Sequence, residues 1–273
     1  MTAAVQPHAA PLPQAVPELH APSRWTAIDL LSDLHLQAGL PRTTAAWAQH
    51  LTSSPAQALI LLGDVFEVWI GDDAAEPGSF EARCEAILRE AARSKTLYFM
   101  AGNRDFLVGP DFLARCGVQA LADPTVLVAF GQRWLLSHGD ALCLDDTDYQ
   151  AFRRQVRDPA WQQGFLTQPL AQRRELAARM RAASEARKRE QGVEGYGDLD
   201  TQAVLAWLAT ANSPVLIHGH THRPGDHALP QGARRHVLSD WDFDTPGPVT
   251  RGDVIRLSAE GLRRVAASSP EGS

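Results

Sequence analysis

The feature that most constrains the fold of this chain is a set of five short apolar runs, each of which ends in a polar motif. Their Leu, Ile and Val content is typical of buried strands, which we expect at Trp25–Ser32, Ala58–Leu62, Thr96–Met100, Arg133–Ser137 and Pro214–Ile217. In layered α/β folds, ligands bind where loops from the carboxyl ends of several strands converge. We therefore predict an α/β fold with one composite site at the ends of these strands.

The motifs that follow the strands contain side chains of the types that bind divalent metals. They are Asp33-Leu34-His35, Gly63-Asp64, Gly102-Asn103-Arg104-Asp105, His138-Gly139-Asp140 and Gly219-His220-Thr221-His222. Two Asp, one Asn and four His among them form a ligand set for two neighbouring metals. Carboxylate and amide oxygens beside imidazole suit Mn²⁺, with Fe²⁺ and Zn²⁺ as alternatives. A metal pair roughly 4 Å apart favours displacement at phosphorus, because one ion generates hydroxide and both neutralise phosphoryl charge.

Each motif taken alone also fits a structural explanation. An Asp-x-His sequence after a strand is commonly a cap or turn, and Gly-Asp is a common turn dipeptide. The Gly-Asn-Arg-Asp segment fits a hydrogen-bonded turn, whereas the two imidazoles of His220 and His222 point the same way in an extended chain. The occurrence of all five motifs in this order favours a functional site.

The length and composition fit one large domain, or one domain with an insertion. Residues 1–23 are rich in Ala and Pro and lack the basic and apolar regions of a signal peptide, so we expect a disordered arm there. We expect the main domain at 24–266 and a frayed tail at 267–273. No run approaches the roughly 20 apolar residues that a membrane helix needs.

Charge and cysteine content narrow the class further. The net charge of −6 argues against general nucleic-acid binding, which requires a basic surface. The three cysteines are odd in number and have no paired spacing, which suits a reducing cytosol, and we expect Cys143 to be a buried structural thiol.

A basic helix is predicted between the His138 and His220 motifs, within an insertion at about 149–200. The segment from Arg173 to Arg189 is rich in Arg, and an apolar face is formed by Leu166, Leu170, Leu176 and Met180. A solvated helix face is one interpretation. A lid over an anionic and partly apolar ligand, or a membrane-binding surface, is the other. The segment Gly192–Asp198 would then be an exit hinge.

Three more strands are predicted after the His220 motif, at Arg234–Leu238, Asp253–Leu257 and Leu262–Ala266. We expect them to complete a second sheet against the first.

The five motifs in this order resemble the calcineurin-like metallophosphoesterases, from roughly Trp25 to Ala266. The resemblance implies two packed β-sheets flanked by helices, with a dimetal site at one end. By motif, it implies that one metal is held by Asp33, His35, Asp64 and His222. It implies that Asp64 bridges to a second metal, held also by Asn103, His138 and His220. His218 matches no ligand of that family and is interpreted as a supporting or structural residue.

A narrower resemblance links the chain to the UDP-2,3-diacylglucosamine hydrolases of lipid A synthesis. It rests on Ser32–Leu36, Gly63–Glu67, Gly102–Leu107, His138–Cys143, Asp145-Asp146, Tyr149–Arg153, Ala178–Arg181 and His220–Pro224. That family uses water to split the diphosphate of UDP-2,3-diacylglucosamine into UMP and the lipid monosaccharide phosphate, usually with Mn²⁺. It carries a helical lid and works at the cytoplasmic face of the inner membrane. The resemblance therefore implies a peripheral membrane enzyme with an acylated UDP-sugar substrate and two divalent ions.

The same resemblance implies which residues contact substrate. Asn103, Arg104 and His220 are expected at the reacting phosphate, where the planar guanidinium of Arg104 would clamp oxygens in a way that Lys cannot match. The remaining expected substrate contacts are Asp146, Arg181, Ser184, Lys188 and Gln191. Lys188 and Gln191 replace the Asn and Lys that are typical of the family, and Val193–Asp200 also departs from its pattern.

Two other functions stay open from the sequence. One is hydrolysis of a water-soluble nucleotide diphosphate such as an ADP-sugar or a CDP-alcohol, against which the apolar and basic helix argues. The other is a non-catalytic binding module, which would show substituted ligands, whereas all seven positions are intact here. No obligate protein partner is inferred.

Overall fold

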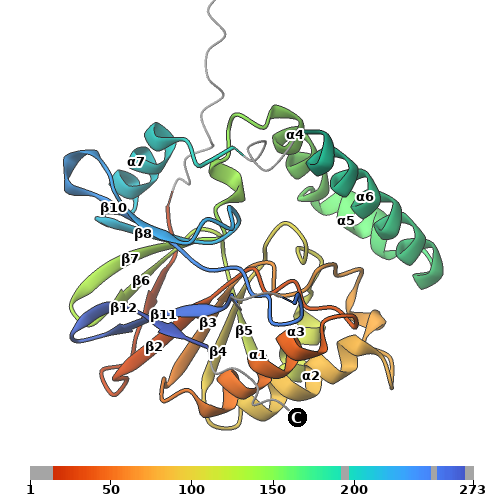
Figure 1. Ribbon diagram of the computed structural model, residues 1–273, viewed down its shortest axis with the longest axis horizontal. Helices are drawn as coiled ribbons and strands as arrows, with labels where there is room; N and C mark the ends of the chain where they lie inside the picture. The colour runs from red at the N-terminus through yellow and green to blue at the C-terminus, as the bar shows by residue number, and fades with distance from the viewer. Residues whose placement is uncertain (1–14, 192–196, 247–250, 268–273) are drawn as a thin grey trace, which may run out of the picture.

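The computed structural model describes residues 15–191, 197–246 and 251–267. Two six-stranded sheets pack face to face with helices on their outer sides (Figure 1). The first sheet has the order β12-β11-β2-β3-β4-β5, and the second has the order β1-β6-β7-β8-β10-β9. This is the predicted α/β architecture of two packed sheets flanked by helices.

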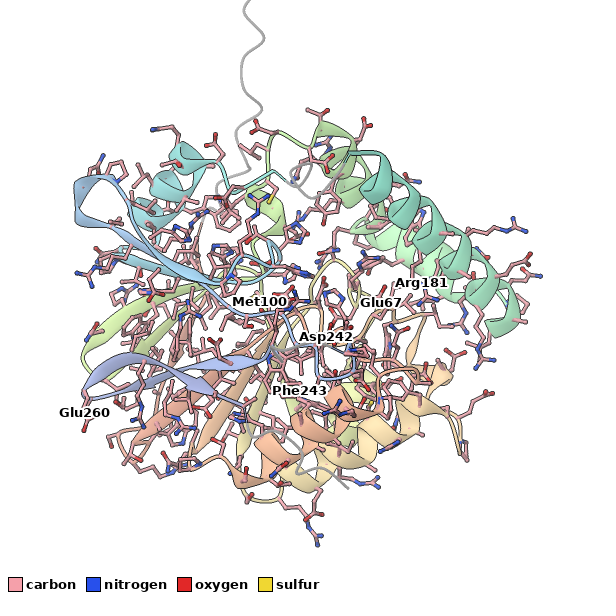
Figure 2. The ribbon with its side chains drawn as sticks, in the orientation of Figure 1. Glu67, Met100, Arg181, Asp242, Phe243 and Glu260 are labelled. Carbon is pink, nitrogen blue, oxygen red and sulfur yellow. The ribbon has the colours of Figure 1, made fainter. Side chains whose placement is uncertain are left out.

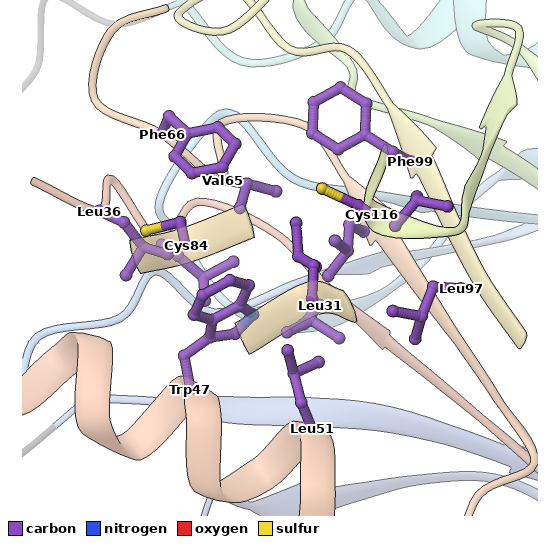
Figure 3. Packing of buried hydrophobic residues seen from close by; sticks show 14 of the residues in the cluster. Leu31, Leu36, Trp47, Leu51, Val65, Phe66, Cys84, Leu97, Phe99 and Cys116 are labelled. Atoms are coloured by element: carbon purple, nitrogen blue, oxygen red, sulfur yellow. The ribbon is translucent and has the colours of Figure 1, made fainter. Parts of the chain in front are cut away.

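The first sheet is built on four parallel strands, with two antiparallel strands added at one edge. Its strands are β2 (Ala27–Leu31), β3 (Ala58–Leu62), β4 (Thr96–Met100), β5 (Val118–Leu121), β11 (Asp253–Ser258) and β12 (Gly261–Ala266). The outer face is covered by α1 (Pro41–Ser53), α2 (Phe80–Ala91) and α3 (Pro110–Cys116). Leu31 and Phe99 pack there against Trp47 and Cys84 (Figure 3). Strands covered on both faces are continuously apolar, which explains the runs seen in the sequence.

The second sheet is mixed. Its strands are β1 (Glu18–His20), β6 (Thr125–Ala129), β7 (Gln132–Ser137), β8 (Val215–His218), β9 (Gly225–Ala228) and β10 (Arg234–Val237). Between the sheets, Ile60 and Met100 pack in one cluster with Leu136 and Ile217. Helix α7 (Thr201–Thr210) covers the outer face.

The expected placement of the last three strands in a second sheet is confirmed for the first of them and wrong for the other two. Strand β10 pairs with β8 in the second sheet, whereas β11 and β12 extend the first sheet beside β2. The β2–β11 pair aligns Asp29 with Arg256, and these two buried side chains form an ion pair at 2.6 Å. An apolar pattern predicts that a strand exists, but this polar pairing decides which strand it joins.

The expected disordered arm was also wrong in part. Residues Glu18–His20 form β1, which pairs in parallel with β6 and occupies its free edge. In the expected tail, Ala267 is buried and its N–H donates to the carbonyl of Gly252 at 3.0 Å. Residues 1–14 and 268–273 lie outside the described part of the chain, as do 192–196 of the expected hinge.

A helical layer is inserted between β7 and β8. It contains α4 (Thr147–Val156), α5 (Pro159–Leu166) and α6 (Leu170–Gln191), and it lies over the carboxyl ends of the first sheet's strands (Figure 1, green to teal). Leu170 and Leu176 of the expected apolar face pack against the core, whereas Leu166 is exposed. In the described ranges, no helix combines the length and apolar character that a membrane span requires.

Candidate metal centre

The carboxyl ends of the five motif-bearing strands meet at one edge of the molecule, as predicted. The loops are joined by backbone hydrogen bonds, from Asp33 N–H to Gly63 O (3.1 Å) and from Gly219 N–H to His138 O (3.0 Å). The two sheets are joined by His220, whose backbone N–H donates to Asp33 Oδ2 at 3.0 Å. Both sheets therefore contribute to a single site.

Asp33, His35 and His222 form the first group of metal-type ligands. One ligand atom from each lies within 4.8 Å of the others. The Nε2 atoms of His35 and His222 are 3.1 Å apart, and His222 Nε2 is 3.5 Å from Asp33 Oδ1. Two imidazole nitrogens directed at each other beside a carboxylate suit a shared cation.

The second group contains Asp64 and His138, again with Asp33, within the same 4.8 Å limit. Asn103 Oδ1 lies 2.9 Å from His138 Nε2 and 2.8 Å from His220 Nδ1. The buried His138 ring is oriented from behind, because its Nδ1 donates to the carbonyl of Leu62 at 3.0 Å. This hydrogen bond directs Nε2 into the site.

Asp64 lies between the two groups. Its Oδ2 is 3.9 Å from His35 Nε2, and its Oδ1 is 3.6 Å from His138 Nε2. A carboxylate with one oxygen on each side suits a bridging ligand. The donor set of imidazole, carboxylate and amide oxygen fits borderline and hard divalent ions.

The backbone of the site is strained at the ligand positions. Five of the seven predicted ligands have left-handed φ angles: Asp33 (54°), His35 (48°), Asp64 (52°), His220 (69°) and His222 (52°). Such angles are uncommon for residues other than glycine, and they persist only where the surrounding structure holds them. Their concentration at one edge supports a functional rather than a structural origin of the motifs.

The site concentrates negative charge. Burial alone would raise the pKa of Asp33, but His222, His138 and His35 hold that pKa well below its usual range. Burial would lower the pKa of His138, yet Asp64, Asp33 and Asp140 outweigh it and raise that pKa to about 9. His138 must lose this proton before it can bind a metal. Bound cations would take the place of that proton.

His220 differs from His138 although the two rings are neighbours, with centroids 5.2 Å apart. Burial and the charge of His138 lower the pKa of His220 to about 4, so its imidazole is neutral at pH 7. Burial likewise lowers the pKa of His218 to about 3, and His218 Nδ1 donates to Gly219 O at 2.8 Å. Cys143 is buried, as predicted.

Some of the expected substrate residues lie in or beside the metal centre, and others lie in the helical layer. Asn103 and His220 lie in the second group, and the backbone N–H of Arg104 donates to Asp64 Oδ1 at 2.8 Å. Arg181 projects from α6 towards Glu67 at the edge of the site (Figure 2). Asp146 caps α4, where its carboxylate accepts a hydrogen bond from the N–H of Tyr149 at 2.9 Å. Ser184, Lys188 and Gln191 belong to α6, but their side chains lie outside the described part.

Three acidic residues of the motifs were given no function from the sequence. Asp105 accepts N–H groups of Val65 and Gly102, both at 2.7 Å, and so ties the loop after β3 to the loop after β4. Asp140 accepts hydrogen bonds from two side chains of α4, and Glu67 from His35. The available signal was their position, two or three residues from a predicted ligand.

The fold and the site together define a metallophosphoesterase. The chain belongs to the calcineurin-like phosphoesterase family, whose sequence profile matches residues 26–224. Divalent metals are implied by this family, and the two ligand groups provide places for them.

Several proteins named UDP-2,3-diacylglucosamine hydrolase are similar to the chain over most of its length. The protein from Chromobacterium violaceum is 46% identical over 244 residues, which cover 87% of this chain and 97% of that protein. A Xanthomonas campestris protein is 45% identical over 243 residues, covering 85% and 95%. A Ralstonia nicotianae protein is 46% identical over 239 residues, covering 83% and 87%. The resemblance inferred from the motifs is confirmed.

Proposed function

We propose that this chain hydrolyses the diphosphate of UDP-2,3-diacylglucosamine to UMP and 2,3-diacylglucosamine 1-phosphate (lipid X), a step of lipid A biosynthesis. The observation that carries the proposal is the convergence of a two-group metal centre with an overlying helical layer. The names of the relatives supply the identity of the substrate.

We propose that two divalent ions, Mn²⁺ in the cell, occupy the two ligand groups. Asp33, His35, Asp64 and His222 would hold one ion, and Asp64, Asn103, His138 and His220 the other. When bound, such a pair activates water and neutralises charge on the phosphoryl group. The arrangement of Asp64 between the groups supports its assignment as the bridge.

The chain's own residues would position the diphosphate for attack by water at the α-phosphorus. The hydrogen bond from Arg104 N–H to Asp64 fixes the backbone beside the centre, so the guanidinium can clamp phosphate oxygens in two-point contact. Asn103 would orient the same phosphate. His220, which is neutral at pH 7, is available to contact phosphate without adding a charge of its own.

The helical layer would bind the lipid half of the substrate. Leu166 and Val68 are exposed large apolar residues. Leu166 packs near Gly71, and Gly71 follows Val68 by only three positions in the sequence. Each buried CH₂ of an acyl chain contributes about 0.8 kcal/mol. Arg181 adds positive charge for the diphosphate, and Asp146, Ser184, Lys188 and Gln191 complete the proposed contacts. A lipid-linked substrate and this basic layer support a peripheral location at the cytoplasmic face of the inner membrane.

Product analysis in H₂¹⁸O tests the reaction. The purified protein with Mn²⁺ should convert the acylated UDP-sugar to UMP that carries the label, because water attacks the α-phosphorus. The deacylated UDP-sugar should react far more slowly. Formation of UDP, or faster hydrolysis of an ADP-sugar or a CDP-alcohol, would contradict the proposal. Retention of activity after complete metal removal would contradict the dimetal assignment.

A further inference from the structure

Glu67 is a mostly buried carboxylate that lies beside the metal centre without belonging to either ligand group. The loop that carries it runs next to the first motif, because Glu67 N–H donates to Leu36 O at 3.1 Å and Leu36 pairs with Phe66. This pairing brings the loop that carries Glu67 alongside the loop that carries His35. Its position is therefore set by backbone hydrogen bonds and not by a flexible surface loop.

Three groups from different parts of the chain face this carboxylate. His35 Nδ1 donates to Glu67 Oε2 at 2.9 Å, and Arg104 Nη1 lies 3.9 Å from Glu67 Oε1. Arg181 approaches from α6 (Figure 2). A ring N–H and two guanidinium groups therefore surround a single carboxylate, which is the side chain suited to accept from all three.

We propose that Glu67 is a positioning residue that holds the metal ligand His35, the phosphate contact Arg104 and the helix α6 in one arrangement. Its contact with His35 fixes the ring tautomer. With the proton on Nδ1 donated to Glu67, the lone pair of Nε2 faces His222 and Asp64. The electrostatic interactions with Arg104 and Arg181 rest on the proposed function, whereas the contact with His35 requires only that a metal binds.

Metal affinity tests the contact with His35. Glu67→Gln keeps an acceptor for His35 Nδ1–H but removes the charge, and Glu67→Ala removes both. Removal of a carboxylate that accepts a hydrogen bond from a ligating histidine typically weakens metal binding by about 10- to 100-fold. We expect Mn²⁺ affinity to fall by an amount in that range for Glu67→Ala and by less for Glu67→Gln. The affinity is measured by titrating the protein with Mn²⁺ and following the electron paramagnetic resonance signal of the free ion.

Glu76→Gln is the matched control, because Glu76 is an exposed carboxylate whose ion pair with Arg174 at 3.4 Å lies at the surface. It should leave Mn²⁺ affinity and activity unchanged. If Glu67→Gln and a folded Glu67→Ala matched the wild type in Mn²⁺ affinity, the proposal would be wrong. Glu67→Gln alone suffices for this decision if Glu67→Ala does not fold, because it retains shape and a hydrogen bond.

A double-mutant cycle tests the electrostatic interaction between Glu67 and Arg181 of α6. Arg181→Gln should raise KM for the acylated UDP-sugar several-fold, and this effect should be smaller when Glu67 is already Gln. If the effects of the two substitutions on KM were strictly additive, Glu67 would not position Arg181. If the wild type failed to hydrolyse the acylated UDP-sugar, the proposed function would fail, yet a fall in Mn²⁺ affinity of Glu67→Ala would still support Glu67 as a positioning residue.

Discussion

Replacement of Arg173 should weaken the attachment of the helical layer while leaving the metal centre intact. Its guanidinium, on a residue only 2% exposed, donates to the carbonyls of Ile70 and Gln168 and to both oxygens of Asp73. Any side chain at Gly71 would collide with it. These contacts attach α6 to the loop after β3, about 100 residues earlier in the chain.

Arg173→Ala should lower the free energy of unfolding by about 2–3 kcal/mol. Hydrogen bonds that involve a charged group contribute about 1.5–3 kcal/mol each. The contribution from Asp73 is smaller, because its side chain is 60% exposed and water can bind its carboxylate in the variant. The buried carbonyl of Ile70 loses a donor without such compensation, and the half-buried carbonyl of Gln168 with only part of it. Urea denaturation followed by circular dichroism gives the value.

Arg174→Ala is the control for that measurement, because its side chain is 52% exposed and pairs with Glu76 at 3.4 Å. An exposed pair of this kind contributes well below about 1 kcal/mol. In Arg173→Ala, hydrolysis of bis(p-nitrophenyl) phosphate should persist under conditions where the protein is folded, whereas activity on the acylated UDP-sugar should fall at least tenfold. Equal stability and equal activities in the two variants would refute the anchoring argument.

Three further perturbations have definite expected outcomes. Asp33→Ala or His222→Ala should reduce turnover by orders of magnitude with the fold retained by circular dichroism, and normal activity would contradict the metal assignment. Arg104→Lys should impair turnover almost as much as Arg104→Ala, because Lys cannot make two-point phosphate contact. Burial would raise the pKa of Asp29, but Arg256 and its other partners lower it, so ionised Asp29 stabilises the fold above pH ~4. Asp29→Asn should therefore cost about 3–5 kcal/mol at pH 7, and the difference from the wild type should shrink as the pH falls below ~4.

The strands that carry the motifs were predictable to within about two residues at each end. They are apolar over their whole length because helices or the opposite sheet cover both faces. By contrast, β1, β5, β6 and β9 were not predicted. Strands β1, β5 and β9 lie at sheet edges and are only three or four residues long, so they carry little periodic signal.

The metal-type residues were predictable because their chemistry is local. A motif of a few residues places Asp33 and His35 at one strand end, and the fold then brings the strand ends together. The orienting contacts are not local. Glu67 follows Asp64 closely in sequence, but its function depends on contact with His35, 32 residues away. No pattern within either motif records that contact.

The arginines of α6 also could not be told apart from the sequence, because their different contacts are set by the fold. Arg173 is buried and anchors α6, Arg174 forms a surface pair, and Arg179 pairs with Glu175 on its own helix. Arg181 lies on the side of α6 that faces Glu67. Sequence charge alone treats the four as equivalent.

Deletion of the whole inserted helix would be an ambiguous test of whether it acts as a lid. Deleting Phe165–Gly192 would remove the buried Phe165 and the anchoring Arg173 together with the exposed charges. Loss of activity in that deletion would therefore not distinguish lost substrate binding from lost core packing. Single substitutions at Arg173 and Arg181 make the distinction, because the first removes a buried anchor of the helix, whereas the second removes a charge near Glu67 and leaves the buried anchor intact.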